Sequence, residues 1–146
     1  LDASESVNQA LGEFSDKLEQ AQLTPVFIPP EEPVMIAADG RLTWRVLSNL
    51  LSNAVKYATP GTRVYVEITK EADKVLLSIK NVSREDIQYS AEELLERFVR
   101  GDASRNREGS GLGLNIAKSL MEVQGGSLQL VLDGDLFKII LTFPAI

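Results

Sequence analysis

The sequence contains no cysteine and no histidine among its 146 residues. The absence of cysteine excludes a disulfide framework and any metal site built on thiolates. The absence of histidine excludes a histidine-ligated zinc ion, a Ser-His-Asp triad and a phosphohistidine within these residues. Any chemistry that needs an imidazole must therefore take it from a segment outside them.

The chain also lacks an excess of basic residues and any long apolar run. Lys and Arg number 15 against 21 Asp and Glu, so the net charge is −6. This balance argues against nucleic acid as a partner. No stretch is long enough for a transmembrane helix, and the start does not resemble a signal peptide. With 44% apolar and 25% charged residues, we expect one soluble, intracellular globular domain.

The first part of the chain is predicted to hold a helix and a short hairpin. Apolar residues three and four positions apart predict a helix over residues 4–22, which Pro25 would end. Short apolar runs at residues 26–28 and 34–37 flank the Pro29-Pro30 turn and predict a small hairpin.

The rest of the chain alternates helices with pairs of strands. Asp39 is a suitable N-cap for a long amphipathic helix that ends near Tyr57. Alternating apolar residues predict two hairpins, with strands at residues 64–68 and 75–79 and at residues 127–132 and 136–143. Between the hairpins we expect a helix at residues 91–98, a polar lid-like loop at 99–109, and a helix ending near residue 123. This order predicts an α+β fold, a two-layer α/β sandwich whose mixed or antiparallel sheet is covered on one face by helices.

The long helix carries a polar stripe beside its apolar face. Asn49, Asn53 and Lys56 lie at positions i, i+4 and i+7, so they share one side of the helix. A carboxamide oxygen is a suitable ligand for Mg²⁺, and a lysine one turn away offers a charge to phosphates. The same three residues could equally form an ordinary solvated face. Asparagine is a poor helix former, however, so two on one stripe suggest a function.

A glycine-rich turn opens the later helix. Glycines at positions 109, 111 and 113 allow a close approach of the backbone to a ligand. The helix that follows presents free N–H groups and a positive dipole end to an anion. The turn lacks the Gly-Lys-Ser/Thr of a Walker loop and does not follow a predicted strand, which disfavours a Rossmann site. It is either a phosphate cradle or a flexible entry to the helix.

Two longer segments carry a family resemblance. The segment NLLSNAVKYA at residues 49–58 resembles the N box of sensor histidine kinases. The segment ERFVRGDASRNREGSGLGLNIAKSLMEVQGG at residues 96–126 resembles their F box, ATP lid and G2 box in unbroken order. The resemblance covers nearly the whole chain from Asp39 onward. It implies the α/β sandwich known as the Bergerat fold, which gyrase B, Hsp90 and MutL ATPases share.

The resemblance also implies roles for single residues. Asn53 would hold Mg²⁺, with Asn49 beside it. Lys56 would contact phosphate, and Tyr57 would pack along the adenine. Asn49 and Lys56 would be the catalytic residues. The lid and the glycine-rich turn would supply further contacts to the nucleotide or the acceptor domain, from Arg97, Phe98, Arg100, Gly109, Ser110, Gly111, Leu112, Gly113 and Leu114.

One motif departs from the family pattern. The family's G1 box reads Asp-x-Gly-x-Gly after a strand, and its aspartate bonds the adenine amine. Here the corresponding segment is Asn81-Val82-Ser83-Arg84-Glu85, so asparagine replaces the aspartate and both glycines are missing. The carboxamide oxygen of Asn81 can still accept from the adenine amine, and its NH₂ group can donate to the ring. Because hydrogen bonds to ionised groups are the stronger ones, we expect a weaker or altered nucleotide affinity.

The function that the resemblance implies is phosphoryl transfer from Mg-ATP to a histidine on a separate dimerisation domain of the same kinase, for relay to a response regulator. Residues 1–22 would be the tail of the dimerisation region or its linker, or a plain terminal helix, packed on a partner helix or on the sandwich. Residues 23–146 would be the catalytic ATP-binding domain. The domain would be cytoplasmic, and the parent protein would be a membrane-anchored homodimer.

Two other functions remain open. ATPase relatives carry a glutamate at the position of Asn49, where it acts as general base for the attacking water. Asparagine cannot accept that proton, so we expect transfer to a protein nucleophile rather than hydrolysis. A gyrase- or Hsp90-like ATPase would instead turn over ATP as an isolated domain. The altered G1 box also leaves open a degenerate nucleotide-sensing module without phosphotransfer.

Overall fold

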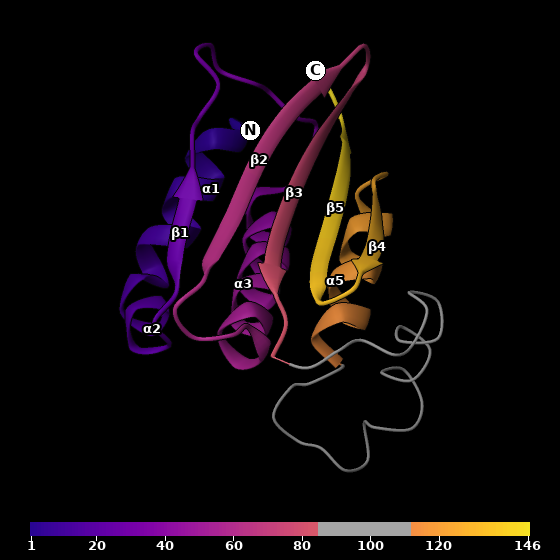
Figure 1. The fold of residues 1–146 in the computed structure, drawn as a ribbon. Coiled ribbons are helices and arrows are strands. Elements are labelled where there is room, and N and C mark those ends of the chain that lie inside the picture. Colours follow the sequence, from indigo (N-terminus) through magenta and orange to yellow (C-terminus); the bar gives the residue numbers. More distant parts are fainter. Residues whose placement is uncertain (85–111) are drawn as a thin grey trace.

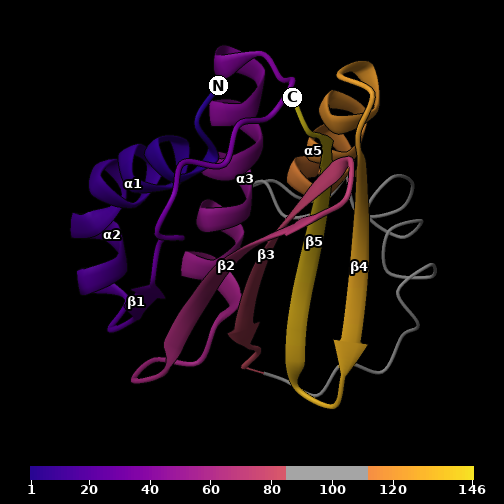
Figure 2. The same ribbon diagram turned by 90° about the horizontal axis from the view of Figure 1, so that it is seen from above.

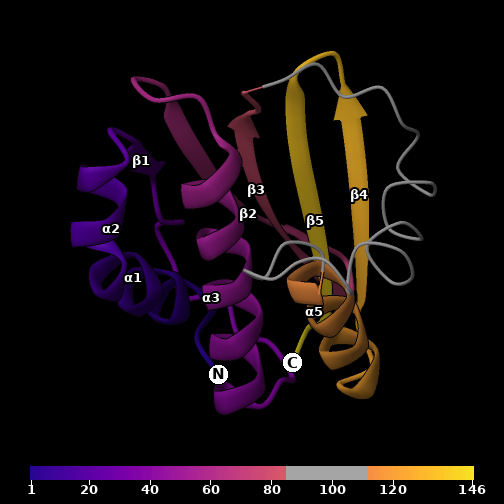
Figure 3. The same cartoon turned by 90° about the horizontal axis from the view of Figure 1, so that it is seen from below.

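The computed structural model describes residues 1–84 and 112–146, and Figure 1 shows their path. The described helices are α1 (Ala3–Glu13), α2 (Ser15–Gln20), α3 (Gly40–Tyr57) and α5 (Leu112–Val123). The described strands are β1 (Thr24–Phe27), β2 (Arg63–Glu71), β3 (Lys74–Val82), β4 (Ser127–Asp133) and β5 (Leu136–Pro144). The helices cover one face of the sheet, with α3 between α1 and α5 (Figure 3), and Figure 2 looks onto the other face. The predicted two-layer α+β sandwich is confirmed.

The described strands form one mixed sheet in the order β1-β2-β3-β5-β4. Strand β1 pairs with β2 in parallel, whereas the β2–β3, β3–β5 and β4–β5 pairs are antiparallel. Both predicted hairpins are confirmed. Ala72 and Asp73 connect β2 to β3, and Gly134 and Asp135 connect β4 to β5.

The core lies between the sheet and the helices. Every second residue of β3 is buried, from Val75 through Leu77 and Ile79 to Asn81. Because side chains alternate between the two faces of a strand, this row points toward the helices. From the helix side, the core receives the buried residues of α3, namely Thr43, Val46, Leu47, Leu50, Leu51 and Ala54. Each large apolar side chain buried in this way contributes about 1.5–3 kcal/mol to folding.

Helix α3 begins where the sequence predicts. The Oδ1 atom of Asp39 accepts a hydrogen bond from the backbone N–H of Leu42 at 2.9 Å, which satisfies one of the free donors of the first turn. The helix ends when Ala58 takes an extended conformation, with its N–H still bonded to the carbonyl of Ala54. The polar stripe of α3 is therefore carried by an uninterrupted helix.

The helix predicted over residues 4–22 is two helices. Phe14 is the C-cap of α1 and the N-cap of α2, with φ −96° and ψ 4°. Its side chain and that of Leu18 are both buried, so the apolar face continues across the interruption. Periodicity alone interprets such a pattern as one helix, because the side-chain spacing survives the change in the backbone.

The N-terminal segment packs on the sandwich. Ala3, Val7 and Ala10 of α1 belong to the same buried cluster as the residues of α3 and the sheet. At the flank of α3, the indole N–H of Trp44 donates to the Oε2 atom of Glu13 at 2.6 Å. Whether residues 1–22 also continue a dimerisation region stays a prediction.

The hairpin predicted at residues 26–28 and 34–37 is wrong. Residues 24–27 form β1, which pairs with β2 instead. The backbone N–H of Ile36 donates to the carbonyl of Leu1, and Ile36 forms an isolated bridge with Ala145. The intervening segment holds prolines at positions 29, 30 and 33. Proline has no N–H to donate, so this segment is a poor hairpin connection, and both apolar runs pair with distant parts of the chain.

Across residues 1–84 and 112–146, none of the helices combines the length and the apolar character that crossing a membrane requires.

Candidate functional site

The polar stripe of α3 borders the buried face of the helix. Asn49, Asn53 and Lys56 are each partly exposed, while Leu50 and Ala54 beside them are buried. Asn53 lies nine positions after Trp44, which at about 100° per residue places the two side chains on opposite sides of the helix. Since Trp44 faces α1 through its bond to Glu13, the stripe faces the other flank. That flank is the one toward α5, as Figure 3 shows.

Helices α5 and α3 share one buried apolar cluster, and one side chain also joins their ends by hydrogen bonds. The Oε1 atom of Gln124, just after α5, accepts from the backbone N–H of Asp39 at 2.8 Å and from the hydroxyl of Thr43 at 3.3 Å. The Nε2 atom of Gln124 donates to the carbonyl of Leu120 at 3.1 Å. The end of α5 is thereby held at the beginning of α3, and the two helices run antiparallel (Figure 3). The N-terminal end of α5 therefore lies beside the C-terminal half of α3.

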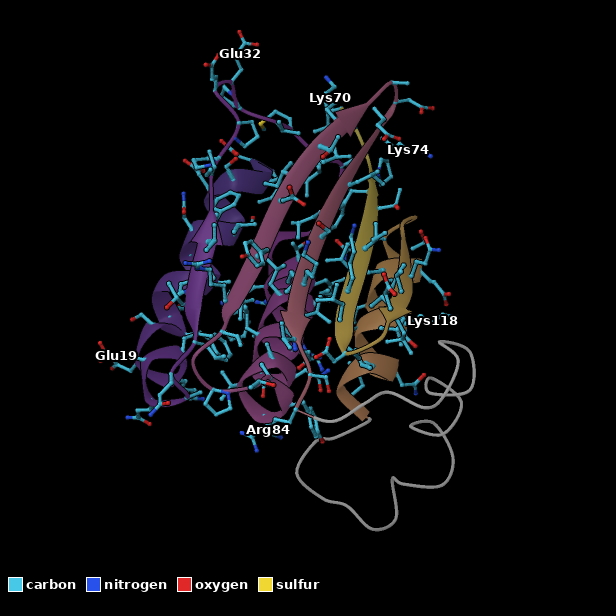
Figure 4. All side chains as sticks on the ribbon, in the orientation of Figure 1. Glu19, Glu32, Lys70, Lys74, Arg84 and Lys118 are labelled. Carbon is cyan, nitrogen blue, oxygen red and sulfur yellow. The ribbon has the colours of Figure 1, made fainter. Side chains whose placement is uncertain are left out.

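The end of β3 meets the same half of α3 through backbone hydrogen bonds. The N–H of Thr59 donates to the carbonyl of Val82 at 2.8 Å, and the N–H of Arg84 donates to the carbonyl of Tyr57 at 2.9 Å. The Nε atom of Arg84 donates to the carbonyl of Ala58 at 3.1 Å. Figure 4 shows Arg84 at this end of the molecule. Because the last carbonyls of a helix lack partners within it, the two bonds from Arg84 also cap α3.

Asn81 brings a polar side chain into this region from the sheet. It is 5% exposed and continues the row of β3 that faces the helices, after Ile79. Its partner across the sheet is Phe137 of β5. No hydrogen bond joins its carboxamide to another side chain or backbone group among residues 1–84 and 112–146. Asn81 is thus a buried polar group on an otherwise apolar floor.

The structure thus brings three of the predicted features to one end of the sandwich: the stripe of α3, Asn81 and the start of α5. Tyr57, in the last turn of α3, is 40% exposed at the same end. Leu114, in the first turn of α5, is 1% exposed, so its side chain packs in the core. Leu112 and Gly113 belong to the helical start of α5, and nothing more is described of them.

Several predicted contacts fall outside the described residues. These are the lid-like loop, the helix at residues 91–98 and the glycine-rich turn before α5, with Arg97, Phe98, Arg100, Gly109, Ser110 and Gly111.

Two described residues were missed by the sequence analysis. Gln124 bonds Thr43 in the first turn of α3, and Arg84 bonds Ala58 at the end of α3. These partners are 81 and 26 positions away in the sequence. Neither Gln124 nor Arg84 lies in a periodic pattern, so no local signal in the sequence distinguishes them. The motif resemblance covers Gln124 but gives it no role.

A magnesium ion fits the chemistry of the stripe. In the described part of the chain no group of three or more His, Cys, Asp or Glu side chains could hold a metal ion. Asn49 and Asn53 instead offer neutral carboxamide oxygens one turn apart. Mg²⁺ is commonly held by few protein ligands, with phosphate oxygens and waters completing its shell. This donor set therefore suits a magnesium ion that arrives with a phosphorylated ligand.

Comparison with known proteins identifies the family. Residues 38–145 match the histidine kinase-, DNA gyrase B- and HSP90-like ATPases. The chain belongs to this family. The match begins one residue before the cap of α3 and ends with β5 and the residue that follows it, so it spans the whole site described above. Membership carries the binding of ATP, and the predicted family is confirmed.

Similar proteins place the chain among the catalytic domains of sensor histidine kinases within this family. The sensor protein IrlS of Burkholderia pseudomallei is 34% identical over 129 residues, covering 87% of this chain and 27% of IrlS. The sensor histidine kinase CusS of Escherichia coli is 34% identical over 112 residues, covering 75% of this chain and 23% of CusS. This chain therefore spans about a quarter of the length of these relatives.

The fold has a counterpart among solved structures. The catalytic domain of histidine kinase ThkA superposes with a TM-score of 0.83 at 23% identity, over 99% of this chain and 93% of that one. This chain thus has the fold of a histidine kinase catalytic domain along nearly its whole length, α1 and α2 included.

Proposed function

We propose that this domain binds Mg-ATP at the end of the sandwich where α3, β3 and α5 meet, and supplies the γ-phosphoryl group to a histidine on a separate dimerisation domain of the same kinase. The observation that carries the proposal is the convergence of the α3 stripe, the buried carboxamide of Asn81 and the N-terminal end of α5. Each of the three offers a contact to a different part of a nucleoside triphosphate.

The base of the nucleotide would lie against Asn81. The carboxamide has an acceptor and two donors, and a planar ring packed on the apolar neighbours of Asn81 would reach them with one polar edge. Tyr57, exposed in the last turn of α3, would pack along the ring. Burial of both ring faces against apolar side chains would supply most of the affinity for the base.

The phosphates would lie between α3 and α5. The start of α5 would present backbone N–H groups and the positive end of the helix dipole, which attract phosphate oxygens. Asn53 would ligate Mg²⁺, with Asn49 beside it, and Lys56 would contact a phosphate from the next turn of α3. When bound, the metal ion supplies positive charge that neutralises the phosphate oxygens as negative charge develops. The glycine-rich turn and Arg97, Phe98 and Arg100 would complete the enclosure.

The nucleophile of the reaction would come from outside this chain. The chain has no histidine, and the side chain of Asn49 is a carboxamide, which does not act as a base toward water. Phosphoryl transfer requires mainly positioning and charge stabilisation. We therefore place the acceptor histidine on the dimerisation domain, with a response regulator as the next acceptor and a membrane-anchored homodimer as the parent protein.

The test is phosphorylation of the parent kinase with radiolabelled ATP and Mg²⁺. Acid-labile, base-stable label on the dimerisation domain is the expected result. The isolated chain of residues 1–146 serves as the comparison and should hydrolyse almost no ATP. Nucleotide binding without any label on histidine would indicate a nucleotide-sensing module. Multiple turnovers by the isolated chain would indicate an ATPase.

A further inference from the structure

Asn81 differs from the other buried polar residue of the described chain in having no described partner. Thr43 and Asn81 are the two buried polar residues among residues 1–84 and 112–146. The hydroxyl of Thr43 is paired with Gln124, whereas the carboxamide of Asn81 bonds no other group in the described part of the chain. Ser4 Oγ, and not the carboxamide of Asn81, is the fully buried side-chain atom without a partner in the described part of the chain, so the donors and the acceptor of Asn81 are reached from solvent and are available to a ligand.

The surroundings of Asn81 define the shape of that ligand. Ile79 precedes it in the same row of β3, and Phe137 lies opposite on β5. Both side chains belong to the apolar layer beneath the helices. An apolar row with a single polar group at its end suits a planar heteroaromatic ring that presents one polar edge to Asn81. This inference rests on the proposed nucleotide site and concerns which base that site accepts.

A carboxamide can pair with either purine, because it carries a donor and an acceptor side by side. Adenine presents an amine donor at position 6 and an acceptor at N1. Guanine presents an oxygen acceptor at position 6 and an N1–H donor. Rotation of the carboxamide by half a turn exchanges its oxygen and its NH₂ group, so one orientation of Asn81 matches adenine and the other matches guanine.

A carboxylate at the same place would discriminate between the two bases. It only accepts hydrogen bonds when ionised. With the ring held so that position 6 and N1 face the side chain, it would pair with the amine of adenine and face the lone pairs of the guanine oxygen. Only a shift of the ring along its edge would bring the N1–H and the 2-amine of guanine to the two carboxylate oxygens. A ligand that leaves buried polar groups of its site unpaired binds much more weakly. A side chain that can exchange its donor and its acceptor avoids this penalty.

We propose that Asn81 makes this site accept guanine as well as adenine nucleoside triphosphates. No backbone change is needed, because Asn81 is held in the β3–β5 pairing by its main chain and only its terminal amide turns. The consequence is a nucleotide-binding domain whose choice between ATP and GTP is set by their concentrations more than by its base contact.

The experiment is a pair of calorimetric titrations of residues 1–146 with the magnesium complexes of AMP-PNP and GMP-PNP. For the native chain, the two dissociation constants should agree to within about tenfold. For Asn81→Asp, the ratio of the GMP-PNP constant to the AMP-PNP constant should rise at least about tenfold above the native ratio. Ser78→Ala is the matched control on the other face of β3 and should leave the native ratio unchanged.

The outcomes separate this proposal from the function on which it rests. Tight AMP-PNP binding by the native chain with GMP-PNP binding more than about a hundredfold weaker would overturn the proposal and leave the ATP site intact. No binding of either nucleotide would overturn both. The native comparison needs no variant, so it stands even if Asn81→Asp, which buries a charge, does not fold. Thermal melting of each variant checks folding.

Discussion

The side-chain oxygen of Gln124 lies 3.3 Å from the hydroxyl of Thr43, and this contact joins the end of α5 to the first turn of α3. The same oxygen accepts from the backbone N–H of Asp39 at 2.8 Å. Thr43 is completely buried, so water does not reach its hydroxyl. This side chain therefore adds a polar contact to the apolar packing that holds α5 beside α3.

Replacing Gln124 by alanine should destabilise the fold by about 1–3 kcal/mol, because it leaves the buried hydroxyl of Thr43 without its partner. The free energy of unfolding in urea measures the effect. Gln129→Ala is the matched control, since Gln129 is exposed on β4, and it should change stability by no more than about 0.5 kcal/mol. Equal losses in the two variants would show that the contact to Thr43 has no net value.

Replacing two glycines by alanine should change the free energy of unfolding in opposite directions. A Cβ atom at Gly126 would collide with the carbonyl oxygen of Thr142 and lie 3.0 Å from the Cε atom of Met121. Gly126→Ala should therefore cost about 1–3 kcal/mol. A Cβ atom at Gly12 of α1 would meet nothing within 4 Å, and Gly12→Ala should stabilise by about 0.5–1 kcal/mol. Thermal unfolding of both variants measures the difference, and a loss at Gly12 or none at Gly126 would contradict it.

The turn between β2 and β3 holds a strained alanine. Ala72 has a φ of 51°, a conformation that disfavours residues with a Cβ atom. Ala72→Gly should raise the free energy of unfolding by about 0.5–1 kcal/mol, which is the relief of that strain less the added entropy of the unfolded chain. Ala21→Gly is the control, because Ala21 has a φ of −83° and should lose stability. A loss of stability in both variants would mean that the turn is not strained.

The residue at position 49 should determine whether bound ATP is hydrolysed by water or kept for transfer to a protein acceptor. If Asn49 lies beside the metal ion and the γ-phosphate, a glutamate there would have a carboxylate that can take a proton from water. We expect Asn49→Glu to raise ATP hydrolysis by the isolated chain at least about tenfold over the native rate. Release of phosphate measures the rate, and Asn49→Gln is the uncharged control. Unchanged hydrolysis by a variant that still binds nucleotide would place Asn49 away from the phosphates.

Much of the fold follows from local patterns. Asp39 with the apolar residues after it predicts α3, and the alternation of Val75, Leu77 and Ile79 predicts β3 in its hairpin. The pairing of β1 was not predictable, because it is parallel and its partner β2 lies on the far side of α3 in the sequence. The interruption at Phe14 was missed because the apolar spacing continues through it.

The candidate site, too, is predictable from the sequence only in part. Helical spacing places Asn49, Asn53 and Lys56 on one stripe without any knowledge of the fold. The position of Asn81 relative to that stripe depends on long-range backbone bonds such as those from Thr59 to Val82 and from Arg84 to Tyr57. No local pattern encodes those bonds. The burial of Asn81, which supports the inference about guanine, could therefore be learned only from the structure.

The most direct measurement is a titration of residues 1–146 and of Asn53→Ala with Mg²⁺ and AMP-PNP, followed by calorimetry and by thermal melting. Alanine is the better helix former, so this variant keeps or strengthens α3, and Ser52→Ala is the neighbouring control. The native chain and Ser52→Ala should bind and be stabilised by the nucleotide, whereas Asn53→Ala should bind at least about tenfold more weakly when Mg²⁺ is present. Equal binding by all three chains, or no binding by the native chain, would contradict a magnesium nucleotide site on α3.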